Sequence, residues 1–213
     1  MDDLVAVLQK KSERLNLFSA GDRLKLGEKH IPDVLAVLNF WEVKNGVHVA
    51  DIGTGGGLPG LALATARPDL EFTLMDATAK KIEAVEEMAD DLNLKNVHGL
   101  VGRFEELAHE KKNREQFDVV TARAVAELPT LLEYAAGFLK VGGKFYAWKS
   151  ADYMAELKNS QKAQKVLGLP FMRVHKYALP SGEDRVILEF NKTTRIATLY
   201  PRKNGLPRAK PIL

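Results

Sequence analysis

The sequence contains no cysteine, which excludes disulfide bonds and thiolate metal sites and fits a reducing compartment. No apolar run approaches the roughly 18–20 residues that a membrane-spanning helix needs. The opening stretch MDDLVAVLQKKSERL begins with acids and lacks the apolar core of a secretory signal. The five histidines are scattered without ligand spacing, so we expect no metal site. These absences predict a cytoplasmic protein that is not bound to a membrane.

Basic residues are concentrated near the end of the chain. The formal net charge is only +3, but residues 191–213 carry six basic side chains and no acidic one. These side chains are Lys192, Arg195, Arg202, Lys203, Arg208 and Lys210. Charge alone is compatible with a segment that binds nucleic acid and equally with a solvated tail.

From residue 44 onward the chain alternates between strand-like and helix-like segments. The expected parallel strands are 47–53, 71–76, 96–101, 117–123 and 144–149. The expected helices are 58–66, 78–93, 129–140 (ended by the VGG at 141–143) and 151–166. This order predicts a doubly wound α/β fold with helices on both faces of the sheet.

Two further strand-like segments, 171–179 and 184–190, are joined by the short, turn-rich PSGED. A link this short joins antiparallel neighbours, so we expect a Rossmann-like, seven-stranded sheet whose last strand is antiparallel. Residues 1–43 are predicted to form two helices that pack on the sheet edge. We therefore divide the chain into a helical extension (1–43), an α/β domain (44–190) and a basic tail (191–213).

The stretch ADIGTGGGLPG at 50–60 has the strand–glycine loop–helix order of a nucleotide-binding site. Gly55, Gly57 and Gly60 match G-x-G-x-x-G, the dinucleotide-binding fingerprint, which by itself is not specific. Asp51 disfavours a pyrophosphate at this position, and Asp76, at the end of the second strand, is placed to accept the hydroxyls of a ribose. With the terminal hairpin, these acids favour S-adenosylmethionine over NAD, whose binding fold ordinarily has an all-parallel sheet. Purely structural roles, as a turn cap or a helix cap, remain the alternatives.

Three more side chains are expected along the same crevice, because each follows the end of a strand. Phe104 and Glu105 follow the third strand and are candidates for adenine contacts, although a core phenylalanine and a solvated glutamate are almost as plausible. Arg123 ends the fourth strand, where it can pair with the methionine carboxylate or with a phosphate.

Several segments together resemble the bacterial GidB/RsmG family of guanine-N7 methyltransferases that act on 16S ribosomal RNA. They are NLFS (16–19), KHIPDVL (29–35), DIGTGGGLPG (51–60), ARPDLEFTLMDATAKK (66–81), GRFEEL (102–107), FDVVTARAVAELPTLL (117–132), GGKFYAWKS (142–150) and YPRKNGLPRAKPIL (200–213). The resemblance implies S-adenosylmethionine as cofactor, and small-subunit rRNA or the small ribosomal subunit as partner. Two departures are Val34, where the family usually has serine, and a shorter helical extension.

The predicted site residues follow from the residues and from this resemblance. The predicted cofactor-binding residues are Asp51, Gly53, Gly55, Leu58, Asp76, Phe104, Glu105 and Arg123. The predicted RNA contacts are His30, Lys149, Arg202, Lys203 and Arg208. Guanine N7 carries a lone pair and no proton, so no general base is required and no catalytic residue is assigned. A monomer is favoured. The alternatives are an NAD-dependent oxidoreductase and a non-catalytic RNA or ribosome-assembly binder.

Overall fold

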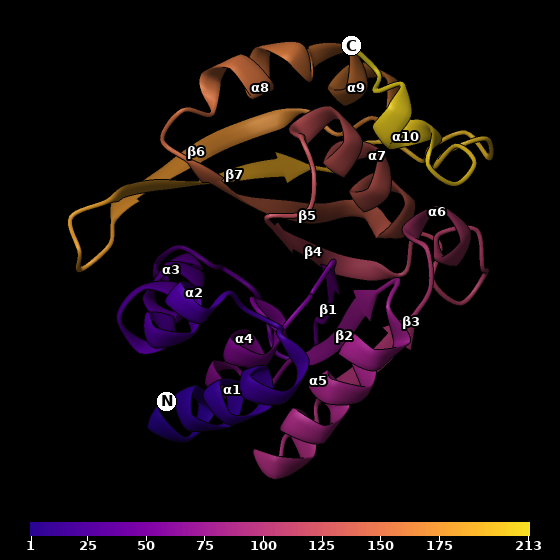
Figure 1. The fold of residues 1–213 in the computed structure, drawn as a ribbon. Coiled ribbons are helices and arrows are strands. Elements are labelled where there is room, and N and C mark those ends of the chain that lie inside the picture. The colour runs from indigo at the N-terminus through magenta and orange to yellow at the C-terminus, as the bar shows by residue number, and fades with distance from the viewer.

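A computed structural model describes residues 1–213, which fold around one seven-stranded sheet (Figure 1). The strands are β1 (His48–Ile52), β2 (Glu71–Asp76), β3 (Val97–Val101), β4 (Phe117–Arg123), β5 (Leu139–Ser150), β6 (Phe171–Ala178) and β7 (Asp184–Asn191). Their order across the sheet is β3-β2-β1-β4-β5-β7-β6. The chain reverses direction across the sheet between β1 and β4, so the carboxyl ends of these strands border a crevice.

β7 runs antiparallel to both of its neighbours, β5 and β6, whereas the other paired strands are parallel. The predicted Rossmann-like fold with its terminal hairpin is therefore confirmed. The all-parallel sheet expected for an NAD-dependent oxidoreductase is not present.

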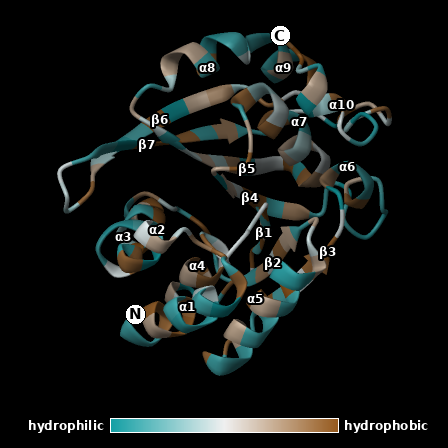
Figure 2. Ribbon diagram, in the orientation of Figure 1, coloured by the Kyte–Doolittle hydropathy of each residue, from teal (hydrophilic) through white to brown (hydrophobic).

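Helices cover both faces of the sheet (Figure 1). The helices are α1 (Asp2–Leu15), α2 (Ala20–Leu24), α3 (Ile31–Leu35), α4 (Gly60–Ala66), α5 (Ala79–Asp91), α6 (Phe104–Leu107), α7 (Leu128–Phe138), α8 (Met154–Asn159), α9 (Gln161–Val166) and α10 (Leu206–Ala209). The apolar residues of α1, α3, α4 and α5 form one buried cluster, and those of α7 and α9 form the other. In Figure 2 α7 is largely hydrophobic, which fits the burial of every one of its residues. No helix is both long and apolar enough to cross a bilayer.

The N-terminal region differs from the two helices that were predicted. After α1 the chain forms α2, a π-helix (η1, Leu26–His30), α3 and a 3₁₀ turn (η2, Ala36–Asn39). Leu4 and Leu8 of α1 join the cluster beneath α4 and α5, so the region packs on a face of the sheet and not on its edge. The prediction of two helices was wrong because the spacing of apolar residues is the same in one continuous helix and in a series of short helical segments.

Two other predicted boundaries were wrong. The helix expected over 151–166 is divided at Ser160, whose backbone angles leave α8 and α9 as separate short helices. The glycines at 142 and 143, predicted to end a helix, lie inside β5, where the pairing with β4 shifts register. α7 already ends at Phe138, because Leu139 adopts an extended conformation.

The predicted tail, 191–213, is packed against the α/β domain. Lys192 is buried and donates to Glu115 at 2.8 Å. Arg202 makes hydrogen bonds of 2.6–3.1 Å through its side chain to Glu133, a carboxylate that is fully buried in α7. Two of the six cations in this segment are therefore neutralised by ion pairs, which charge counting did not reveal.

Candidate active site

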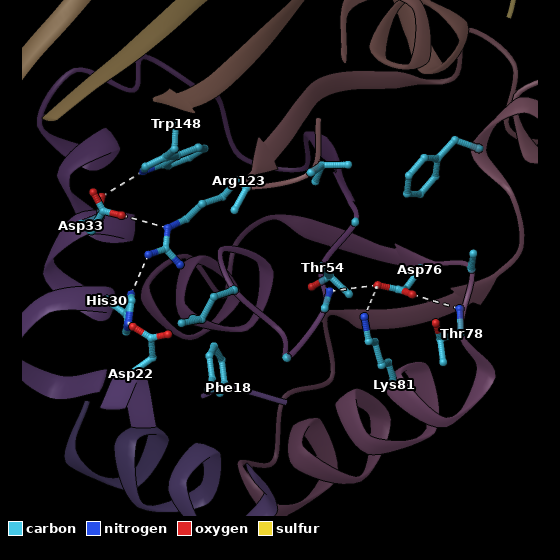
Figure 3. A pocket seen from close by; sticks show the side chains of 18 of the residues that line it. Phe18, Asp22, His30, Asp33, Thr54, Asp76, Thr78, Lys81, Arg123 and Trp148 are labelled. Carbon is cyan, nitrogen blue, oxygen red and sulfur yellow. Dashed lines mark hydrogen bonds and ion pairs between the residues drawn. The ribbon is translucent and has the colours of Figure 1, made fainter. Parts of the chain in front are cut away.

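A cavity of about 880 Å³ lies at the carboxyl ends of β1, β2, β4 and β5 (Figure 3). One end is bounded by residues that follow β2 and β3, including Asp76 and Phe104. The opposite end is bounded by the N-terminal segment and by the ends of β4 and β5, including His30, Arg123 and Trp148. Six cationic and three anionic side chains line the cavity, so positive charge predominates there. This charge favours anionic ligands.

Asp51 lies beneath the glycine loop and not in the cavity. Its Oδ2 accepts a hydrogen bond of 3.0 Å from the Gly60 backbone N–H, and its Oδ1 accepts one of 3.0 Å from the Thr121 hydroxyl. The side chain is fully buried, and this burial raises its pKa to about 6 despite the hydrogen bonds that it accepts. The structure thus places Asp51 as an anchor that ties the loop to β4, away from the predicted contact with the cofactor.

The loop itself forms one wall of the cavity, and Gly53, Gly55 and Leu58 lie there as predicted. Gly55 has φ +56°, and a Cβ built on it would meet no atom closer than 3.9 Å. The space beside this glycine is therefore open, as a closely approaching ligand requires. Thr54 also lines this wall, and its buried hydroxyl lies beside the Asp51 carboxylate, whose pKa it lowers.

Asp76 ends β2 and keeps its carboxylate at the cavity wall. Its Oδ2 accepts from the Gly55 backbone N–H at 3.2 Å, and its Oδ1 accepts from the Thr78 backbone N–H at 2.9 Å. The Lys81 ammonium group lies 3.6 Å from Oδ2. An ionised carboxylate offers about four acceptor sites, so it retains capacity for the hydroxyls of a ribose. The open space at Gly55 and this carboxylate together fit a nucleoside cofactor.

Phe104 and Glu105 point in different directions. Phe104 lines the cavity and packs edge-to-face on Tyr134, with ring centroids 5.3 Å apart. Glu105 is buried outside the cavity, where it accepts hydrogen bonds from the Gly205 backbone N–H at 2.8 Å and the Tyr134 hydroxyl at 3.3 Å. Glu105 therefore ties the C-terminal segment to α6, and its side chain is turned away from the predicted adenine contact.

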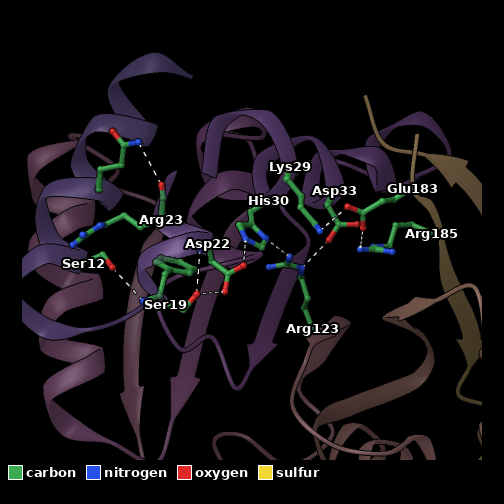
Figure 4. Close-up of polar contacts among 12 residues, drawn as sticks. Ser12, Ser19, Asp22, Arg23, Lys29, His30, Asp33, Arg123, Glu183 and Arg185 are labelled. Atoms are coloured by element: carbon green, nitrogen blue, oxygen red, sulfur yellow. Dashed lines mark hydrogen bonds and ion pairs between the residues drawn. The ribbon is translucent and has the colours of Figure 1, made fainter. Parts of the chain in front are cut away.

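Arg123, at the end of β4, is held by two residues of the N-terminal segment (Figures 3 and 4). Its Nε donates to Asp33 Oδ2 at 2.8 Å, and its Nη2 donates to His30 Nδ1 at 2.6 Å. Burial and the neighbouring Arg123 charge lower the pKa of His30 below its usual value. The neutral imidazole is the form that accepts a hydrogen bond from a guanidinium.

The predicted RNA contacts are spread over several environments. His30, Lys149 and Arg208 line the cavity. Lys149 pairs with Glu156 at 2.6 Å, whereas Arg202 is engaged by Glu133 and lies outside the cavity. Lys203 is exposed and makes no ion pair, so it remains available to a polyanion. The structure does not bring these residues together as one surface.

Several cavity residues were missed from the sequence. They are Phe18, Asp22, Asp33, Thr54, Lys81, Arg103, Trp148 and Arg185. Trp148 lies near the carboxyl end of β5 and Lys81 in the first turn of α5, positions that strand ends predict to border the crevice. Asp33 and Phe18 belong to an extension whose packing only the structure reveals.

Comparison with known proteins identifies the family. The sequence matches the family model GidB, described as rRNA small subunit methyltransferase G, over residues 1–184. The chain belongs to the GidB family. It is 39% identical to the ribosomal RNA small subunit methyltransferase G of Desulfitobacterium hafniense, over 95% of this chain and 84% of that protein. The corresponding protein of Alkaliphilus metalliredigens is 36% identical, over 97% of this chain and 87% of the relative.

Solved structures agree on the fold of this GidB family member. A SAM-dependent methyltransferase from Aquifex aeolicus superposes with a TM-score of 0.58 at 17% identity, covering 79% of this chain and 93% of that one. A methyltransferase in complex with the Trm112 activator of Haloferax volcanii gives a TM-score of 0.60 at 17% identity, covering 83% and 96%. Family membership confirms the predicted rRNA methyltransferase and S-adenosylmethionine as its cofactor.

Proposed function

We propose that this chain methylates N7 of a guanine in small-subunit ribosomal RNA, with the adenosine portion of its cofactor and its target base at opposite ends of the cavity. The proposal rests on one observation: the two ends of the cavity are lined by side chains of different chemistry. Asp76 and Phe104 supply an acceptor and an apolar wall at one end, and aromatic and cationic side chains supply the other end. A methyl donor held between two such ends would face the target base, which supports the proposal.

The nucleoside end is built to hold the cofactor. Asp76 accepts hydrogen bonds from the ribose hydroxyls, and Phe104 provides apolar surface for the adenine. Close approach of the loop is possible because Gly55 presents no side chain. When bound, S-adenosylmethionine supplies a methyl group on a positively charged sulfur, which makes that methyl open to attack by a lone pair.

The opposite end suits a nucleobase that has left its stack. Phe18 lies over Gly56, where a Cβ would come within 2.7 Å of its ring, and it stacks on His30 with centroids 6.3 Å apart. Trp148 lines the same end and is fixed by a hydrogen bond of 2.9 Å from its Nε1 to the Asp33 carbonyl. Aromatic side chains stack on extruded bases, and the surrounding cations attract phosphates.

No side chain at this end has to act as a general base. Guanine N7 carries its lone pair without a proton, so the chain's contribution is to align N7 with the methyl group and to exclude water. The histidine that lines the cavity, His30, already uses both ring nitrogens in contacts with Arg123 and Asp22.

Replacement of guanine N7 by carbon tests the proposal. Small-subunit rRNA transcribed with 7-deazaguanosine keeps the Watson–Crick edge of every guanine but lacks the attacking lone pair. We expect the protein to bind this RNA and to transfer no labelled methyl group to it, while unmodified RNA is labelled. Equal labelling of both RNAs would contradict N7 as the acceptor, and binding of both without labelling would indicate a non-catalytic RNA binder.

A further inference from the structure

Arg123 is the centre of a continuous chain of hydrogen bonds that joins three parts of the molecule (Figure 4). On one side Ser19 donates to Asp22 at 2.6 Å, and Asp22 is 3.2 Å from Nε2 of His30. On the other side Asp33 accepts from Arg123 and also from the Tyr177 hydroxyl of β6, at 2.5 Å. The guanidinium is therefore clamped between α2 and η1 on one side and α3 with β6 on the other.

The clamp leaves one guanidinium nitrogen free. Nε and Nη2 are used by Asp33 and His30, whereas Nη1 has no hydrogen-bond partner in the chain. Arg123 lines the cavity, and in Figure 3 this remaining nitrogen projects toward the interior between the two ends. A planar guanidinium whose Nε and Nη2 are both held cannot rotate, so the N–H groups on Nη1 keep a fixed direction.

The π-helix η1 is what brings His30 to this place. It spans Leu26–His30, and its wider turn ends at His30, immediately before α3 carries Asp33 to the other side of the guanidinium. π-helical turns are rare and often occur at functional sites. Asp33 itself is almost fully buried, and its backbone carbonyl accepts from Trp148, so the clamp also fixes the neighbouring cavity wall.

We infer that Asp33 and His30 are positioning residues, which hold Arg123 so that its free Nη1 donates to the carboxylate of the methionine portion of the cofactor. This inference deepens the proposed function, because it says how the N-terminal segment contributes to cofactor binding. It also requires neutral His30, since Nδ1 must accept the hydrogen bond from Arg123 while Nε2–H donates to Asp22.

The charged groups that face His30 are Asp22 of α2, Asp33 of α3 and Arg123 of β4. Protonation of His30 would put a proton on Nδ1 against the guanidinium and remove that half of the clamp. Because burial and Arg123 lower the pKa of His30, this loss occurs below the ordinary histidine range. Carboxylate recognition should therefore weaken as the pH falls, and the adenine and ribose contacts should not.

Two ligands separate the carboxylate from the rest of the cofactor. S-adenosylhomocysteine carries the amino acid portion, whereas 5′-methylthioadenosine has the same adenosine and sulfur without it. The experiment measures the Kd of each ligand by calorimetry, without RNA, for the wild type, Asp33→Asn, His30→Asn and Arg123→Lys, with thermal melting to show that each variant folds. If Asp33→Asn does not fold, Tyr177→Phe replaces it, because that change removes only the hydroxyl that holds Asp33.

We expect Asp33→Asn to weaken the binding of S-adenosylhomocysteine about tenfold, which corresponds to the loss of one charged hydrogen bond. The affinity for methylthioadenosine should not change. Wild-type affinity for S-adenosylhomocysteine should fall as the pH is lowered below 6.5, the ordinary pKa of histidine. This fall should disappear in His30→Asn, whose amide oxygen replaces Nδ1 but does not titrate. Unchanged or tighter S-adenosylhomocysteine binding in Asp33→Asn would overturn the inference, as would equal losses for both ligands. If the wild type bound neither ligand, the proposed function would fail as well.

Discussion

Asp51 Oδ2 accepts a hydrogen bond of 3.0 Å from the backbone N–H of Gly60, nine residues further along the chain. The two residues lie at opposite ends of the glycine loop, so this one contact closes the loop over the carboxylate. A Cβ at Gly60 would lie 2.9 Å from the same oxygen and 2.5 Å from Leu74. The loop is thus shaped by a buried charge and by a position that has no room for a side chain.

The buried carboxylate makes the stability of the protein depend on pH. Burial raises the pKa of Asp51 from 3.8 to about 6, so folding disfavours its ionised form. Its contribution to stability is therefore greatest below pH 4 and is lost as the pH rises through 6. A shift of about two pKa units corresponds to about 3 kcal/mol.

Asp51→Asn keeps an acceptor for Gly60 and removes the charge. We expect the variant to be more stable than the wild type at pH 7.5, by up to about 3 kcal/mol, and equal to it at pH 4. Urea unfolding at several pH values measures the difference. A difference in the free energy of unfolding between the two proteins that does not change with pH would show that the carboxylate is not the group that titrates.

Gly60→Ala should destabilise the protein by about 1–3 kcal/mol, because the new methyl group overlaps Leu74 and presses on Asp51. The matched control is Gly21→Ala in α2, where a Cβ meets nothing within 4 Å. The control should be neutral or slightly stabilising, since alanine favours a helix. Thermal melting compares the two, and equal melting temperatures would contradict the tight packing of the loop.

Asp76→Asn should weaken the binding of S-adenosylhomocysteine by roughly 10–100-fold, because the variant loses charge-assisted hydrogen bonds to the ribose. Asp91→Asn serves as control, since Asp91 is exposed at the end of α5 and makes no ion pair. Calorimetric titration measures both affinities. The same affinity in both variants would remove Asp76 from the cofactor site.

Arg202→Met should cost about 3–5 kcal/mol of stability, because Glu133 would remain buried as an unpaired carboxylate. Adding Glu133→Gln to this variant should recover much of the loss. Lys203→Met, one residue further on, should leave stability unchanged. It should lower the number of counterions released on RNA binding, measured from the salt dependence of the affinity, by about one. If Arg202→Met instead altered only RNA binding, the predicted RNA contact would hold and the structural pairing would not.

The sequence was sufficient for those parts of the fold that are encoded locally. The strands at 71–76 and 117–123 were predicted with the bounds that the structure has, because short runs rich in apolar residues mark them. The short PSGED link correctly predicted the antiparallel hairpin. Asp76 and Phe104 were found at the cavity because strand ends meet there in every doubly wound sheet.

What the sequence did not reveal depends on contacts between distant segments. Asp51 and Glu105 stand next to cavity residues, yet both turn away from the cavity toward partners that lie 70 and 100 residues further along the chain. The clamp on Arg123 joins residues more than 90 positions apart, and no local pattern predicts such pairing. The charge of the C-terminal segment likewise suggested a free tail until Glu115 and Glu133 were placed beside it.

The position of the transferred methyl group tests the central claim most directly. The protein is incubated with methyl-labelled S-adenosylmethionine and small-subunit rRNA, free or in assembled subunits, and the label is mapped by borohydride and aniline cleavage, which cuts RNA at N7-methylguanosine. We predict that the label lies at N7 of a guanine. Label on another atom, or no label under conditions in which the protein binds both the RNA and the cofactor, would contradict the account.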